Sequence, residues 1–265
     1  QAKELPKSDM ALPALALQFD NQAQELCPNI SFMEIEIETV PTKYESYLEA
    51  FFKDLGINKN NFFTDISNYL AYESGQPTHC FDQSTMQGHF SLAKKKLNTK
   101  FKTLLDTELE LTDENLVFLL DDAVISLAGT MGGASTACSS NTTKVLVECA
   151  YFHPEEILGK ARKYNLSSEA AYKFERGADY LCQEDVLRRF LHIVSEHTEI
   201  KSVAFYSEQN KTRLAEVPFD ADKLNAVIGI DITEKEQLSY LNALGFEAGK
   251  SITVPAHRSD VDQLN

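Results

Sequence analysis

Two polar side chains stand in surroundings that are otherwise apolar. Glu148 is a lone carboxylate within the apolar run 145–152, and His79 lies in a Gly-Gln-Pro-Thr-His segment just before Phe81. A carboxylate in such a run either faces water from an edge strand or pairs with a polar partner in a pocket. A histidine can orient an ester or a water molecule by hydrogen bonding, although one beside an aromatic ring is often structural. The residues leave these alternatives open.

The segment Gly129-Thr-Met-Gly-Gly is the third feature with chemical potential. It follows an apolar stretch that reads as a strand. Glycines at this density indicate a turn that side chains cannot enter, or a wall that a ligand approaches closely.

Several kinds of chemistry are disfavoured. The sequence has no Gly-x-Ser-x-Gly elbow for a serine nucleophile, and its five scattered cysteines form no Cys-x-x-Cys pair, which argues against structural zinc and a disulfide framework. His192 and His197 are five residues apart on a predicted helix, so they point about 140° apart and do not share a face as metal ligands would. We expect no metal site.

The charge balance limits contact with nucleic acid. A net charge of −15 over 265 residues opposes non-specific binding to phosphate backbones. The run Lys94 to Lys96 reads as a solvated helix face, and the basic residues nearest the candidate site are Lys160, Arg162, Lys163, Lys173 and Arg176. No uninterrupted apolar stretch reaches the roughly 18 residues of a membrane helix, so we expect a cytoplasmic protein with no membrane partner.

The strands and helices expected around these residues indicate an α+β fold for residues 1–208, with a mixed sheet and packed helices. Alternation over 33–37 predicts a strand with one face buried and one in water. Residues 116–127 predict a hairpin with an acidic turn, and 144–151 predict a further strand. Helices are expected over 47–55 with Gly56 as the stop, from Pro154, from Ser167 or Ser168, and over 183–197.

Residues 209–265 predict a second, smaller domain. Two short helices, 222–228 and one begun by the capping box Thr233-Glu-Lys-Glu236, give it helix-turn-helix character. The second helix is too acidic for a DNA groove, so DNA binding is only a remote alternative.

Segments spread over the chain resemble the bacterial-type beta subunit of phenylalanyl-tRNA synthetase. They are Asp65-Ile-Ser-Asn-Tyr with Gly75-Gln-Pro-Thr-His-Cys-Phe-Asp82, Gly129-Thr-Met-Gly-Gly133, Val145-Leu-Val-Glu-Cys-Ala-Tyr-Phe152, Ala170-Ala-Tyr-Lys-Phe-Glu-Arg-Gly177, Asn225-Ala-Val-Ile-Gly-Ile, Leu244-Gly-Phe and Val254-Pro-Ala-His-Arg-Ser-Asp260. The resemblance implies that the chain is the central part of a longer subunit, and that its small domain lacks the last element.

The resemblance also implies an editing activity, the hydrolysis of tyrosine misattached to phenylalanine tRNA. Glu148 matches the ligand of the tyrosine hydroxyl, and His79 matches the editing-site histidine. Gly132 and Ala170 match small positions of the pocket wall. Ser168 stands where many relatives have threonine, and it is expected to be catalytic together with His79.

The remaining implications concern the pocket wall and the partners. Gly129 and Pro77 are expected to bind substrate, and backbone N–H groups of the 129–133 turn are candidate donors to the ester carbonyl. Expected partners are the acceptor end of phenylalanine tRNA and an alpha subunit, in an alpha2 beta2 assembly. No cofactor is expected in this chain, while ATP and magnesium belong to the alpha subunit. The alternative is a structural, subunit-interaction module that has lost editing.

Overall fold

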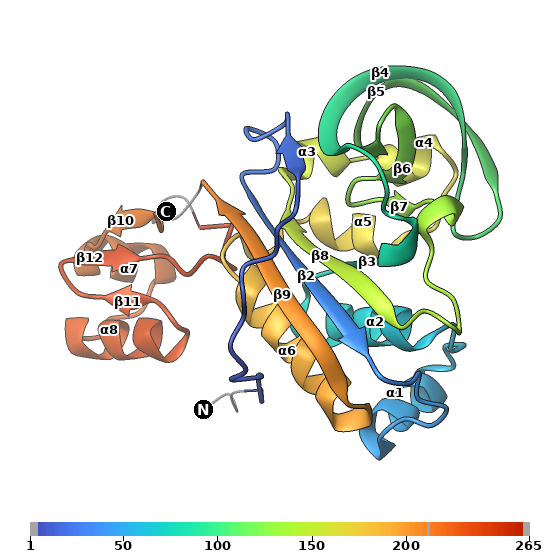
Figure 1. The fold of residues 1–265 in the computed structure, drawn as a ribbon. Coiled ribbons are helices and arrows are strands. Elements are labelled where there is room, and N and C mark those ends of the chain that lie inside the picture. Colours follow the sequence, from blue (N-terminus) through green and yellow to red (C-terminus); the bar gives the residue numbers. More distant parts are fainter. Residues whose placement is uncertain (1–4, 211–212, 262–265) are drawn as a thin grey trace.

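The structure, a computed structural model, describes residues 5–210 and 213–261. The larger domain is built on an antiparallel sheet that runs diagonally through Figure 1. Its strands, in order across the sheet, are β3 (His79–Asp82), β8 (Lys144–Tyr151), β2 (Asn29–Ile37) and β9 (Ile200–Gln209).

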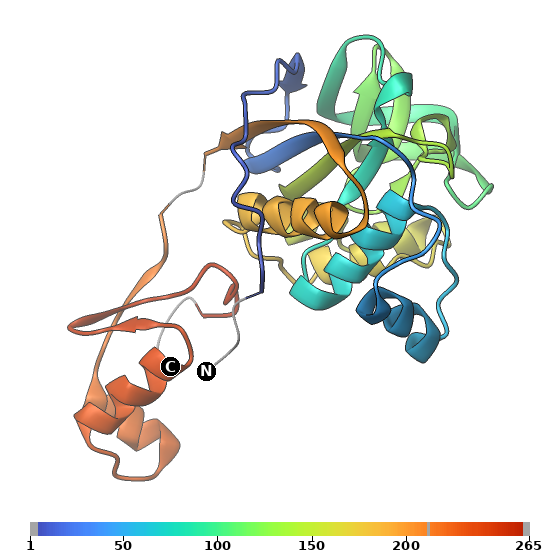
Figure 2. The same cartoon turned by 60° about the horizontal axis from the view of Figure 1, so that its bottom comes forward.

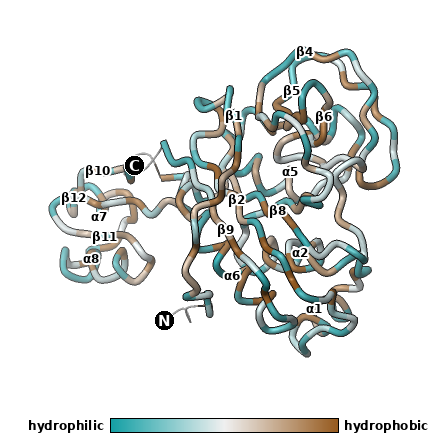
Figure 3. Tube along the Cα trace, in the orientation of Figure 1, coloured by the Kyte–Doolittle hydropathy of each residue, from teal (hydrophilic) through white to brown (hydrophobic). Residues whose placement is uncertain are grey.

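Helices cover one face of this sheet, and Figure 2 shows two of them, α2 and α6, packed beneath it. The covering helices are α1 (Ser46–Leu55), α2 (Phe62–Ser74) and α6 (Gln183–His197). As predicted, α1 ends where Gly56 takes up a left-handed conformation, which glycine adopts without strain. Figure 3 shows hydrophobic residues concentrated along β2 and β8, where the buried core lies.

A second sheet and short helices cover the opposite face. Because β1 pairs parallel with β4 and the other pairs are antiparallel, this sheet is mixed, as expected. Its order is β1 (Phe19–Asn21), β4 (Phe90–Lys102), β5 (Glu108–Leu120), β6 (Ala123–Leu127) and β7 (Met131–Gly132). The short helices are α3 (Pro154–Ile157), α4 (Lys160–Lys163) and α5 (Glu169–Phe174), with 3-10 turns η1 (Gln83–Thr85) and η2 (Ala134–Thr136).

The alternation predicted over 33–37 is present in β2, where Met33, Ile35 and Ile37 are buried and Glu34 and Glu36 are partly exposed. The strand begins earlier than this pattern, and its first residues are buried on both faces, since Ile30 and Phe32 pack against the second sheet and Met33 packs against the helices. One sequence expectation is corrected. The run Lys94 to Lys96 lies in β4, so its assignment to a helix face is wrong.

Most of the smaller domain lies to one side of the larger one in Figure 2, and Ala256 packs with Tyr151 and Tyr180 of the larger domain. It contains the two predicted helices, α7 (Ala221–Ile228) and α8 (Glu234–Ala243), and the Thr233 capping box is present. The sequence prediction missed a small sheet beside them, in the order β10 (Glu216–Pro218), β12 (Ser251–Thr253) and β11 (Glu247–Ala248). These strands have only two or three residues, too few to show a period of two.

Candidate functional site

A cavity of about 480 Å³ opens between the two sheets of the larger domain. This volume is within the range of small-molecule sites, roughly 300–1,000 Å³. The cavity is lined by the N-terminal half of α2, the start of β3, the turn between β4 and β5, the β6–β7 segment, one residue of β8 and the start of α5. Elements distant in the sequence therefore meet at this one place.

Glu148 and His79 face each other across two paired strands. The antiparallel register of β3 and β8 sets His79 directly opposite Glu148, so their side chains leave the same face of the sheet. That face is the one covered by the second sheet, because the neighbouring residues Leu146 and Ala150 of β8 belong to the core between the sheets. The strand alternation thus turns both polar side chains into the cavity.

Both side chains retain unused hydrogen-bonding capacity. Glu148 is 5% exposed. Its Oε1 atom and the Nε2 atom of His79 are buried and have no hydrogen-bond partner in the described part of the chain. A buried polar atom without a partner costs free energy, so such atoms are expected where a ligand or water supplies one. The alternative of Glu148 on an exposed edge strand is excluded, because β8 lies between β3 and β2.

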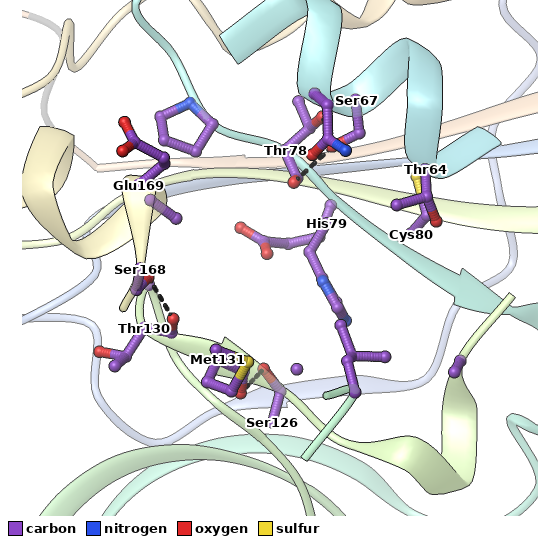
Figure 4. A pocket seen from close by; sticks show the side chains of 18 of the residues that line it. Thr64, Ser67, Thr78, His79, Cys80, Ser126, Thr130, Met131, Ser168 and Glu169 are labelled. Carbon is purple, nitrogen blue, oxygen red and sulfur yellow. Dashed lines mark hydrogen bonds between the residues drawn. The ribbon is translucent and has the colours of Figure 1, made fainter. Parts of the chain in front are cut away.

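Burial also sets the protonation of the pair. It raises the pKa of Glu148 to about 8 and lowers the pKa of His79 to about 4. In each case the protein interior disfavours the charged form. At neutral pH, His79 is therefore uncharged and Glu148 is mostly protonated. Figure 4 shows His79 in the middle of the cavity. The ring of Phe81, on the same strand, lies 4.4 Å from the His79 ring, centroid to centroid.

The glycine segment forms the wall beneath His79. A Cβ atom at Gly132 would lie 2.3 Å from Cε1 of His79 and 2.7 Å from Cδ1 of Leu104. A side chain there would therefore displace the histidine. Gly129 has a φ of +63°, and a Cβ atom at this position would meet the side chains of Ile157 and Phe152 at 2.9 and 3.0 Å. Both positions require glycine, one beside the cavity centre and one in the core behind it.

Ser168 ties the start of α5 to this wall. Its hydroxyl donates to the Thr130 carbonyl at 2.6 Å and accepts from the backbone N–H of Ala171 at 3.1 Å, capping α5. Figure 4 shows the Ser168–Thr130 hydrogen bond at one side of the cavity. Since its one proton goes to a backbone carbonyl, Ser168 is placed to position the wall. Ala170 and the buried Pro77 also line the cavity.

The part of the chain that holds the cavity matches a known protein family. The model of the B3/4 domain family matches residues 33–199, a range that includes every residue named above for the cavity. The chain belongs to the B3/4 domain family.

Curated relatives of this B3/4 domain are phenylalanine–tRNA ligase beta subunits, which confirms the resemblance inferred from the sequence. The chain is 32% identical over 213 residues to the subunit of Neisseria meningitidis serogroup B, covering 78% of the chain and 27% of the relative. The chain is 31% identical over 247 residues to the subunit of Burkholderia pseudomallei, and this match covers 91% of the chain and 30% of the relative. The chain thus spans less than a third of the length of either relative.

A solved structure also overlaps the chain. The crystal structure of an N-terminal fragment of the phenylalanyl-tRNA synthetase beta subunit from Pyrococcus horikoshii covers 97% of this chain, and the chain covers 74% of that fragment. The TM-score is 0.45 and the sequence identity is 10%.

Sequence reasoning missed two parts of the B3/4 cavity. Polar residues of α2 and the loop before it, among them Asn61, Thr64 and Asn68, form one wall. Their spacing of three to four residues is a helical signal that could have identified this face. Leu104 and Leu105, in the turn between β4 and β5, form part of the rim, and no local pattern indicates that this turn reaches the cavity.

Two backbone donors in the glycine segment are occupied. The N–H of Thr130 donates to the Leu127 carbonyl, and the N–H of Gly133 donates to the Ile125 carbonyl, each at 2.9 Å. These two groups therefore do not face a ligand, and the expectation of ester-carbonyl donors is wrong for them. Over residues 5–210 and 213–261, no group of three or more His, Cys, Asp or Glu side chains could hold a metal ion. The helices in the same ranges include none long and apolar enough to cross a membrane.

Proposed function

We propose that this B3/4 domain hydrolyses tyrosine misattached to phenylalanine tRNA, as part of a phenylalanine–tRNA ligase. The observation that carries the proposal is a pair of buried, unpartnered atoms, Oε1 of Glu148 and Nε2 of His79, on paired strands that line one cavity of about 480 Å³. The homology to phenylalanine–tRNA ligase beta subunits supports the choice of substrate.

Glu148 is the group that distinguishes tyrosine from phenylalanine in this proposal. A phenolic hydroxyl donates one hydrogen bond and accepts another, so it can pair with a carboxyl group that is protonated or ionised. Phenylalanine leaves the same carboxyl without a partner, at a cost of about 1–3 kcal/mol. A site that demands the hydroxyl therefore complements an apolar synthetic pocket, which rejects an added hydroxyl only about a hundredfold.

His79 orients the attacking water. Its pKa of about 4 makes it a weak base at neutral pH, but the uncharged ring can accept a hydrogen bond from water at Nε2. Water adds to the carbonyl carbon of the ester, and the bond between that carbon and the ribose oxygen breaks. The proton that water loses ends on this ribose oxygen, which becomes a free hydroxyl. The products are free tyrosine and uncharged tRNA.

Two cysteines and Ser168 in the described cavity wall are poor candidates for a nucleophile. Burial raises the pKa of Cys138 to about 12 and the pKa of Cys80 well above its usual value, so both remain thiols at neutral pH. The hydroxyl of Ser168 is committed to two backbone groups. We therefore assign the attack on the ester to a positioned water.

The wider assembly belongs to the proposal as well. The partners are the acceptor end of phenylalanine tRNA and an alpha subunit in an alpha2 beta2 enzyme of the cytoplasm. ATP and magnesium serve amino-acid activation on the alpha subunit, apart from this chain.

The test is Glu148→Ala in the complete subunit pair, with Tyr-tRNA hydrolysis and phenylalanine activation measured separately. We expect hydrolysis to fall about 10- to 100-fold, the equivalent of the unmade hydrogen bond, and activation to stay unchanged. Ala170→Trp, which fills the cavity without changing charge, should also abolish hydrolysis. Hydrolysis at the parental rate in both variants would contradict the proposal and favour a structural module.

A further inference from the structure

The charges around the cavity are unevenly distributed. Its titratable side chains are His79, Cys80, Cys138, Glu148 and Glu169, and no Lys or Arg of the described residues lines it. Burial disfavours the charged form of the first four. Glu169 differs because it is exposed at the rim. By formal charge, the rim therefore carries one exposed carboxylate, and no Lys or Arg of the described lining balances it.

The carboxylate of Glu169 has no polar side-chain partner among the described residues. Glu169 is the first residue of α5, held there by the Ser168 cap. Figure 4 shows Glu169 and Ser168 on one side of the cavity, Thr64 and Cys80 on the other, and His79 between them. Within the described residues, the Glu169 carboxylate makes no ion pair or side-chain hydrogen bond, whereas Glu156 in the first turn of α3 pairs with Lys94 at 2.9 Å. An acid at a helix start stabilises that helix, but this role does not require a place on the cavity rim.

We propose that the Glu169 carboxylate receives the α-ammonium group of the aminoacyl ester and restricts the site to esters with a free α-amino group. This inference rests on the proposed function. An ammonium group brings a positive charge and three donors to a cavity whose described lining has Glu169 as its one exposed carboxylate. An N-acylated ester brings a neutral amide instead. Glu148 then selects the side chain, and Glu169 selects the amino group.

The experiment compares Glu169→Gln with Glu155→Gln in the complete subunit pair. Glu155 is a matched control, because it is also an exposed acid in the first turn of a short helix but does not line the cavity. The substrates are Tyr-tRNA and N-acetyl-Tyr-tRNA at pH 7 and low salt. Glu169→Gln should raise the KM for Tyr-tRNA about three- to fivefold, in keeping with an exposed ion pair, and should leave kcat nearly unchanged.

The N-acetyl substrate supplies the decisive comparison. Its KM should be the same for the parent and for Glu169→Gln, while Glu169→Asp should recover part of the effect on Tyr-tRNA. Added salt should reduce the difference in the KM for Tyr-tRNA between the parent and Glu169→Gln. An equal KM for Tyr-tRNA in the parent and in Glu169→Gln, or an equal loss with both substrates, would overturn the assignment.

A binding measurement separates this inference from the proposed function. If the parent hydrolyses no Tyr-tRNA, the proposed function fails. Glu169 is then tested with the non-hydrolysable tyrosyl amide of 3′-amino-3′-deoxyadenosine and its N-acetyl derivative. The parent should prefer the free amine, and Glu169→Gln should lose that preference. A preference that persists in Glu169→Gln would remove Glu169 from amine recognition.

Discussion

Glu148 and His79 show the same physical effect in opposite directions. Burial in the same cavity raises the pKa of the acid and lowers the pKa of the base. Both side chains are therefore predominantly neutral near pH 7, and the cavity offers hydrogen-bond partners with little charge. Such a site suits a phenolic hydroxyl better than a carboxylate or a phosphate, which would need a cation that the described residues do not place in the cavity wall.

The pKa values predict a pH dependence of stability. The pKa of Glu148 rises from 4.5 to about 8 on folding, so this residue loses its stabilising contribution as pH rises through that interval. The pKa of His79 falls from 6.5 to about 4, so this residue changes the pH dependence of stability mainly at lower pH. Between pH 6.5 and 8, the parent should lose about 2 kcal/mol relative to Glu148→Gln. Urea unfolding at the two pH values measures this, and parallel changes in both proteins would contradict it.

At the scale of secondary-structure elements, the six-residue helix α5 positions several residues of the cavity. Its cap residue Ser168 also bonds the Thr130 carbonyl, so one hydroxyl joins the helix to the glycine wall. Ala170 and Glu169 then follow on the cavity side. The position of a short helix thus fixes both a small wall residue and the charged group at the rim.

Ser168→Ala tests this link, with Asp220→Ala as control. Both substitutions remove an N-cap, since Asp220 accepts from the Lys223 N–H at 2.9 Å in α7. Each should cost about 1 kcal/mol of stability. Only Ser168→Ala should lower Tyr-tRNA hydrolysis, and Ser168→Thr should retain it, because threonine keeps the hydroxyl. Equal hydrolysis by the two alanine variants would show that the Thr130 link is dispensable.

At the scale of the whole molecule, the charge is strongly negative. The net charge is −15, and several cations near the candidate site are already neutralised. Lys163 pairs with Asp113, Arg176 pairs with Glu175, and Lys94 pairs with Glu156. Ion pairing therefore reduces the number of free cations around the pocket. If the proposed function holds, we expect other parts of the enzyme to deliver the tRNA acceptor end.

The isolated chain should accordingly bind tRNA weakly. Few neutralised phosphates release few counterions, so affinity should fall about tenfold or less between 50 and 200 mM salt. A protein with 6–10 phosphate contacts loses about 10³ to 10⁵ over the same range. A salt titration of chain and tRNA measures the slope, and tight binding with a steep slope would reveal a basic surface that these charges do not predict.

The sequence alone determined the local elements and the unusual residues. The strand over 144–151, the helix over 183–197 and the caps at Gly56 and Thr233 follow from patterns between near neighbours, and the structure has them. Glu148 also stood out in the sequence, because burying a carboxylate within an apolar run costs free energy.

Only the tertiary structure decided what that carboxylate faces. The register of β3 on β8 sets His79 opposite Glu148, and the second sheet closes the cavity over them. Cross-strand pairing and sheet stacking join residues far apart in the chain, and a local period of two is the same whether a face meets water or another sheet. For the same reason, the sequence could not place the turn at Leu104 beside Gly132, although that contact completes the wall.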